Sequence, residues 1–179
     1  MQFRLIYRGP LPAETSKPRV KYKHAIRKFL HPQLRELWQQ HDFLRHNVNY
    51  HAAQFHRCGY RFVPLISTLQ AKRCALDILF LRRDAPGNIV ASGGDIDNRI
   101  KVLFDGLKMV ESANQLPPDA AAPGLDEDPF FCLLQDDSLI TEVKITTDRL
   151  LESPSPSGNV HDVELIIHVR TPAIDFGDE

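Results

Sequence analysis

An amphipathic segment between two strand-like stretches constrains the fold of this chain most. Its apolar residues recur at spacing i, i+3, i+4 and i+7, which predicts a helix over residues 96–109 with one buried stripe. The stripe consists of Ile100, Leu103, Phe104 and Leu107. Residues 72–82 before it read as a strand, because every second residue from Cys74 to Phe80 is apolar.

Further elements follow from the same periodicities. A first strand runs from Phe3 to Tyr7 and ends at Gly9-Pro10, and residues 138–148 and 160–170 read as two more strands. Helical spacing begins at Tyr22, and Pro32 is expected to break this helix or to open a second one that reaches about Arg45. Residues 62–69 are expected to be extended.

This order of elements predicts an α+β fold. We expect a single domain over residues 1–179, with helices packed on a mixed or antiparallel sheet of about four strands. Three cysteines are too few and too scattered for a disulfide scaffold, no stretch approaches the ~20 apolar residues of a membrane span, and no export signal is evident. A cytoplasmic location is therefore expected.

Charge is divided unevenly along the chain. Residues 1–83 hold 16 Lys and Arg against 4 Asp and Glu, a net of +12, whereas residues 84–179 hold 6 against 19, a net of −13. The basic half favours a polyanion partner, although two halves that attract each other within one domain explain the asymmetry equally well. The candidate phosphate contacts are Lys17, Arg19, Lys21, Lys23, Arg73, Arg82 and Arg83.

Two stretches of the acidic half have no periodic pattern. Residues 111–129 are rich in Pro, Ala and Asp and are expected to form a long surface insertion, and residues 171–179 form an acidic tail. Phe130-Phe131 follows the insertion directly. The pair is expected to anchor the insertion to the core, the alternative being a wedge into branched DNA.

The acidic half also carries a dense motif, Gly94-Asp95-Ile96-Asp97-Asn98-Arg99-Ile100-Lys101, at the start of the predicted helix. Asp97, Lys101 and Asp105 are spaced four residues apart, and Lys108 follows three residues later, so these four residues line one helix face. By itself the motif has an ordinary structural explanation, in which Asp95 or Asp97 caps the helix and the series forms a weak surface ladder of salt bridges.

A second acidic pair, Asp136-Asp137, stands directly before a predicted strand. A plain turn explains it, but several carboxylates gathered in one place are held ionised most readily by a cation. Mg²⁺ suits such oxygen ligands, and Mn²⁺ is able to substitute for it. Carboxylates, a metal ion and one lysine together would suit phosphodiester hydrolysis.

The two motifs together resemble the RusA family of Holliday-junction resolvases, which is common in bacteria and their prophages. Asp95, Asp97 and Asp137 match the metal-binding carboxylates of that family, and Lys101 matches its catalytic lysine. Asp136 and Asp105 match further acidic positions, of which Asp136 is a candidate metal ligand, and Asn98 matches a supporting asparagine.

The resemblance implies a RusA-like nuclease domain in which residues 84–170 form the catalytic half. It further implies a homodimeric, Mg²⁺-dependent endonuclease that resolves four-way DNA junctions by paired symmetric nicks, in DNA recombination and repair. Two features depart from the family pattern: 29 residues separate Leu107 from Asp137, and the region before residue 72 is long. A nuclease for other branched nucleic acid and a non-catalytic DNA-binding module therefore remain alternatives.

Overall fold

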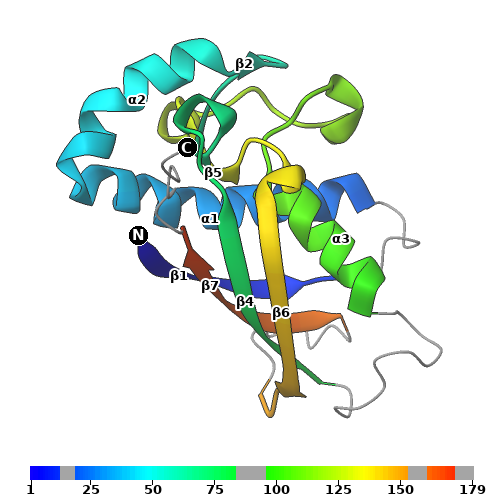
Figure 1. Ribbon diagram of the computed structural model, residues 1–179. Coiled ribbons are helices and arrows are strands. Elements are labelled where there is room, and N and C mark those ends of the chain that lie inside the picture. Colours follow the sequence, from blue (N-terminus) through cyan, green and yellow to red (C-terminus); the bar gives the residue numbers. More distant parts are fainter. Residues whose placement is uncertain (13–18, 84–95, 153–160, 172–179) are drawn as a thin grey trace.

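A computed structural model describes residues 1–12, 19–83, 96–152 and 161–171. Its larger sheet has the strand order β1-β7-β4-β6 and comprises β1 (Gln2–Pro10), β7 (Asp162–Arg170), β4 (Cys74–Arg82) and β6 (Ile140–Arg149). β7 is antiparallel to β1 and β4, whereas β4 and β6 are parallel. The chain thus has the predicted α+β fold, with the predicted mixed sheet of four strands (Figure 1).

A second sheet of three strands was not predicted. It contains β2 (His56–Arg57), β3 (Tyr60–Ile66) and β5 (Phe130–Leu134), with β3 parallel to β5. All five residues of β5 are buried, so its sequence has no alternation that would reveal a strand.

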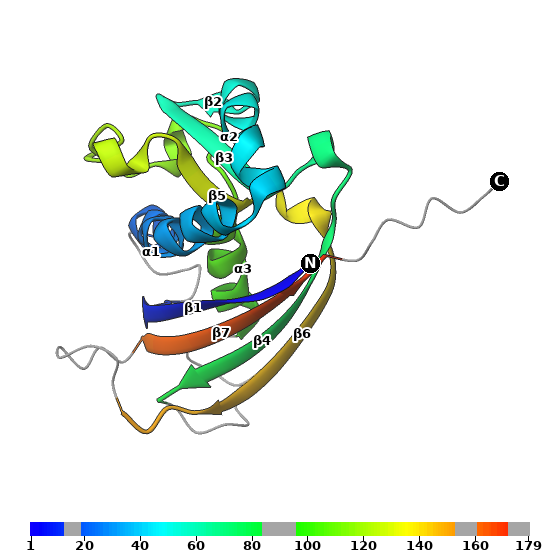
Figure 2. The ribbon, with the colours of Figure 1, turned by 90° about the vertical axis from the view of Figure 1, so that its left-hand side faces the viewer.

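Three described helices complete the fold. α1 (Arg19–Gln40) lies between the two sheets, α2 (Asp42–Gln54) follows it, and α3 (Ile96–Leu107) packs with α1 over one face of the larger sheet (Figure 2). The predicted helix 96–109 is therefore confirmed. None of the described helices is long and apolar enough to cross a membrane.

The expected break at Pro32 is wrong, because α1 continues through this residue and ends only at Gln40. Proline removes one hydrogen bond from the helix. Leu30 and Leu34 on either side of it are 2% and 1% exposed, and burying each of them contributes about 1.5–3 kcal/mol, enough to keep the helix intact.

The insertion 111–129 lies on the surface but is tied to the elements beneath it. It contains the short 3₁₀ helices η2 (Ala113–Gln115) and η3 (Leu125–Glu127). Glu127 pairs with Lys28 of α1 at 3.0 Å, and Asp128 pairs with Arg61 of β3 at 2.7 Å. Phe130 and Phe131 are buried in β5, which confirms that they anchor the segment.

Helices α1 and α3 approach each other closely at Gly106. A Cβ atom on this residue would lie 2.7 Å from Cγ2 of Ile26, a fully buried side chain of α1. Only glycine therefore allows α3 to lie against α1 at this distance.

We predict that Gly106→Ala destabilises the protein by about 1–2 kcal/mol. Alanine favours a helix over glycine by about 1 kcal/mol, but overpacking a buried contact costs about 1–3 kcal/mol or more. Urea unfolding measures the difference. Gly124→Ala is the matched control, because nothing lies within 4 Å of a Cβ there and its φ of −69° suits alanine. Equal stability of both variants would contradict the close contact.

Candidate functional site

The exposed face of α3 carries Asp97 and Lys101, one helical turn apart. The backbone N–H of Asn98 donates to Oδ1 of Asp97 at 2.8 Å. Among the described residues, neither Asp97 nor Lys101 forms an ion pair. The alternative of a surface ladder through Asp97, Lys101 and Asp105 is therefore wrong, and Asp97 and Lys101 face solvent.

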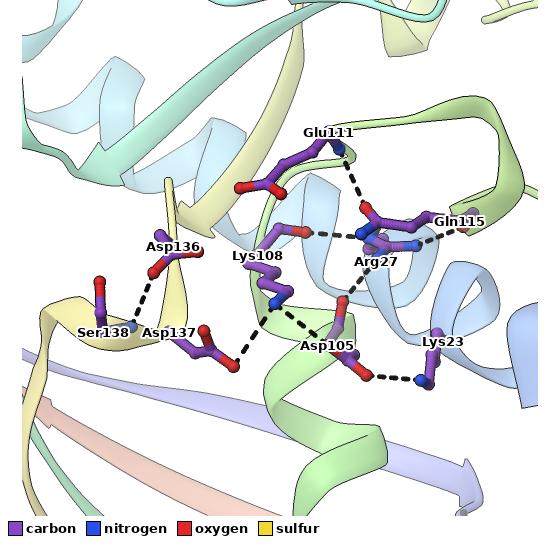
Figure 3. Close-up of polar contacts among 9 residues, drawn as sticks. All are labelled: Lys23, Arg27, Asp105, Lys108, Glu111, Gln115, Asp136, Asp137 and Ser138. Atoms are coloured by element: carbon purple, nitrogen blue, oxygen red, sulfur yellow. Dashed lines mark hydrogen bonds and ion pairs between the residues drawn. The ribbon is translucent and has the colours of Figure 1, made fainter.

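At the other end of α3, ion pairs join the two acidic motifs. Nζ of Lys108 lies 3.2 Å from Oδ1 of Asp105 and 3.4 Å from Oδ2 of Asp137. Nζ of Lys23, from α1, lies 2.5 Å from Oδ2 of Asp105. The four side chains alternate in charge along a continuous path from α1 across α3 to the acidic pair (Figure 3).

Backbone pairing brings these segments together. Directly after α3, Lys108 forms a parallel bridge with Leu134, and the N–H of Met109 donates to the carbonyl of Leu134 at 2.9 Å. The chain that leaves α3 therefore runs beside the end of β5. Asp136 and Asp137 follow that end and lead into η4 (Asp137–Leu139) and β6.

Arg27 of α1 holds the end of α3 through hydrogen bonds to backbone carbonyls. Its Nη2 donates to the carbonyl of Asp105 at 2.6 Å, its Nε to that of Lys108 at 2.9 Å and its Nη1 to that of Gln115 at 3.4 Å. The guanidinium thus satisfies carbonyls that a helix end leaves without partners (Figure 3). Burial lowers the pKa of Arg27 to about 10, so the side chain stays charged at neutral pH.

The ion pairs set the protonation of this cluster. Desolvation alone would raise the pKa of Asp105, but hydrogen bonds and attraction from Lys23 and Lys108 outweigh it and lower that pKa. Desolvation alone would lower the pKa of Lys108, but attraction to Asp137 and Asp105 raises it overall. Both charges therefore persist across the neutral pH range.

Asp136 has a structural role in the described chain. Its Oδ1 accepts a hydrogen bond from the N–H of Ser138 at 3.0 Å and so caps η4. Hydrogen bonding from Ser138 lowers the pKa of Asp136. The capping contact points one carboxylate oxygen at the backbone.

A polar pocket of about 250 Å³ opens beside Asp105. Its walls come from the first turns of α1 and from the segment after α3, and three of its side chains are basic. The lining residues are Arg19, Val20, Lys23, Arg27, Asp105, Ser112, Asn114 and Gln115. Cationic groups, a hydroxyl and a helix N-terminus in one hollow suit a phosphate group.

The structure does not bring all the predicted metal ligands together. Asp95 lies outside the described residues. Asp97 begins α3, whereas Asp137 contacts Lys108 just past its end, and a helix rise of 1.5 Å per residue separates Asp97 from Leu107 by about 15 Å. Among the described residues, no three His, Cys, Asp or Glu side chains are grouped to hold a metal ion. Asp97, Asp136 and Asp137 therefore do not form one ligand set within the described chain.

The residues predicted to contact phosphate differ in their exposure to solvent. Arg19, Lys21, Arg73 and Arg83 are exposed, and Lys23 lines the polar pocket, whereas Lys17 lies outside the described residues. Arg82 is 3% exposed, so its prediction as a phosphate contact is wrong. The alternation of β4 points Arg82 to the buried face that Ile78 and Phe80 share.

Sequence reasoning missed the contact of Lys108 with Asp137 and the role of Arg27 in fixing the end of α3. Helical spacing places Lys108 on the same face as Asp105, with which it pairs at 3.2 Å, but this spacing carries no information about Asp137. No comparable signal marks Arg27, because its three partners are backbone carbonyls 78 to 88 residues away.

Comparison with known proteins adds no relative. No model of a known protein family matches the sequence, and no curated protein or solved structure matches the chain.

We predict that Asp105→Asn lowers stability at neutral pH and flattens the loss of stability in acid. A carboxylate with a lowered folded pKa contributes stability above its unfolded pKa of about 3.9 and loses it as the pH falls through the folded value. Urea unfolding between about pH 7 and pH 2 measures this window. Asp126→Asn is the control, because its side chain is 95% exposed. A pH dependence unchanged from the wild type would contradict the ion-pair path.

Proposed function

We propose that this protein is an endonuclease that cuts branched DNA, with the four-way junction as its substrate and a homodimer as its working form. The observation that carries the proposal is the contact of Lys108 with both Asp105 and Asp137. It joins the two acidic motifs whose pairing underlies the resemblance to junction resolvases, although 29 residues separate Leu107 from Asp137 in sequence.

Binding of a DNA backbone fits the surroundings of this contact. The polar pocket beside Asp105 presents Arg19 and Lys23, and the N-terminus of α1 lines the same hollow. Such groups position a nucleic acid through its phosphates without reading its sequence. On a dimer, two such surfaces would meet the several arms of a junction.

The exposed side chains of α3 suit the chemical step. Lys101 is free of ion pairs among the described residues and exposed, so its ammonium group can approach a scissile phosphate and stabilise the negative charge that develops there. Asp97 lies one turn before it and presents a solvent-facing carboxylate. These two residues are the proposed catalytic pair.

Mg²⁺ is the proposed cofactor, since this ion takes few protein carboxylates and completes its shell with water and phosphate oxygens. The resemblance implies Asp95, Asp97 and Asp137 as ligands; Asp97 lies in the first turn of α3, and Asp137 pairs with Lys108 just past the last turn. Asp97 lies one helical turn before Lys101 in α3. Asp137 forms an ion pair with Lys108.

A second function, a DNA-binding module without catalysis, is favoured by one observation. Lys108 neutralises both Asp105 and Asp137, and such a carboxylate–lysine cluster is stable without a metal ion. The module would use the same basic pocket and the same side of α3.

Cleavage of a synthetic mobile four-way junction, with Mg²⁺ and with EDTA, tests the proposal. We expect paired nicks that depend on the metal and are lost in Asp97→Asn, while this variant binds the junction as well as or better than the wild type because it removes a negative charge near DNA. Asp77→Asn is the matched control, since this carboxylate pairs with Lys144 on the sheet face opposite α3.

Three outcomes separate the alternatives. Tight junction binding without cleavage in Mg²⁺ or Mn²⁺ would favour the binding module. Equal cutting of three-way or linear duplexes at matched concentration would assign a different branched or unbranched substrate. Loss of binding together with cleavage in Asp97→Asn would contradict the role of Asp97.

A further inference from the structure

A second pocket, of about 320 Å³, lies between α2 and the 3₁₀ helix η1 (Thr68–Gln70) that follows β3. It belongs neither to the acidic cluster nor to the polar pocket described above. Its lining residues are Phe43, Asn47, Tyr50, His51, Leu69, Gln70 and Lys72. We call it the aromatic pocket.

The aromatic pocket exposes side chains that a folded protein usually buries. Phe43 is 70% exposed, Tyr50 is 56% exposed, and Leu69 on η1 is 44% exposed. Phe43 and Tyr50 are seven residues apart in α2, so two turns place them on nearly the same helix face. Exposed aromatic rings gathered at one hollow indicate a binding surface.

The polar groups of the aromatic pocket are two amides, a phenol hydroxyl, an imidazole and a lysine. Asn47 lies between the two aromatic residues in α2, and its Nδ2 donates to the carbonyl of Phe43 at 2.7 Å, which leaves its Oδ1 as the acceptor. Nε2 of Gln70 lies 2.7 Å from Nε2 of the buried His51. Within the described part of the chain, Oε1 of Gln70 and Nδ1 of His51 have no hydrogen-bond partner. Lys72 adds a positive charge, and none of the described residues that line the pocket carries a carboxylate.

We infer that the aromatic pocket binds an unpaired nucleobase in a single-stranded stretch of nucleic acid. Aromatic rings stack on any base, amide side chains pair with base edges, and a lysine attracts the adjacent phosphate. The described lining of the pocket carries one lysine and no carboxylate, which favours a polyanionic ligand over a protein partner. The inference deepens the proposed function and rests on it, since both concern nucleic acid.

Hydrogen bonds connect the aromatic pocket to the candidate site. Oε1 of Gln135 accepts from both the N–H and the hydroxyl of Thr68 at 2.9 Å, and the N–H of Gln135 donates to the carbonyl of Ile66 at 2.9 Å. Gln135 directly precedes Asp136, so the residue that is hydrogen-bonded to η1 is covalently joined to the acidic pair. Unpaired bases near the centre of a branched substrate would therefore lie beside the acidic pair, at the end of α3 away from Asp97 and Lys101.

Photocrosslinking tests this inference. A single-stranded oligothymidine that carries 4-thiothymidine is irradiated with the full chain in EDTA, and the crosslinked peptides are mapped by mass spectrometry. We expect crosslinks at Phe43 or Tyr50. Phe43→Ala and Tyr50→Ala should each weaken binding of the oligonucleotide at least about fivefold, the lower end of what stacking of one base contributes.

Two controls keep the result specific. Tyr50→Phe retains an aromatic ring and should bind as the wild type does. Leu125→Ala removes a fully exposed apolar side chain in η3, at the surface of the insertion, and should also bind normally. Both alanine variants in α2 change exposed positions, so circular dichroism is expected to show a native fold.

Two results would overturn the inference. Crosslinks that map elsewhere with unchanged affinity of both alanine variants would exclude a base site. A smaller oligomer of Phe43→Ala in sedimentation, with unchanged oligonucleotide affinity, would show a protein interface instead. EDTA prevents metal-dependent cleavage, so the crosslinking and cleavage experiments are independent. Crosslinks in the aromatic pocket of a protein that cuts no junction would contradict only the nuclease proposal. Junction cleavage without crosslinks in the aromatic pocket would contradict only the proposed base site.

Discussion

The arrangement of the candidate site depends on one buried cation, the guanidinium of Arg27. It projects from the middle layer of the fold and binds three carbonyls that belong to α3 and to the segment after it. Burying a charge is unfavourable unless its hydrogen bonds are made, and bonds to a charged group contribute about 1.5–3 kcal/mol each. Three acceptors offset the burial and fix where α3 ends.

From this fixed end the rest of the site follows. Gly106 lets α3 lie against Ile26 of α1, and the backbone of Lys108 then pairs beside Leu134. The side chain of Lys108 consequently lies between Asp105 and Asp137. Contacts from α1, α3 and β5 thus assemble charges that are far apart in sequence, and the basic pocket forms against the same helix end.

Periodic segments of the fold could be predicted from the sequence, and segments without a period could not. Helix α3 and strand β7 each bury one face, so their apolar residues recur at 3.6 and 2 residues. Strand β5 is buried throughout and gave no alternation. Pro32 suggested a helix break, but burial of its neighbours outweighs one missing hydrogen bond.

In the candidate site, too, sequence spacing predicted the contacts within one element but not those between elements. Helical spacing correctly placed Asp97, Lys101 and Asp105 on one face of α3. Spacing along the chain could not tell at which end of that helix Asp137 would lie, because this depends on the long-range pairing of Lys108 with Leu134. Arg82 was misjudged for a similar reason, since its burial depends on the face that β4 turns to the core.

Hydrogen exchange of the backbone amides, with and without a four-way junction in EDTA, tests most directly whether the two acidic motifs form one DNA-binding site. We predict that the junction protects residues 97–111 and 135–139 together, because Lys108 links them. Protection of only one of these segments, or of neither while the junction is bound, would contradict it.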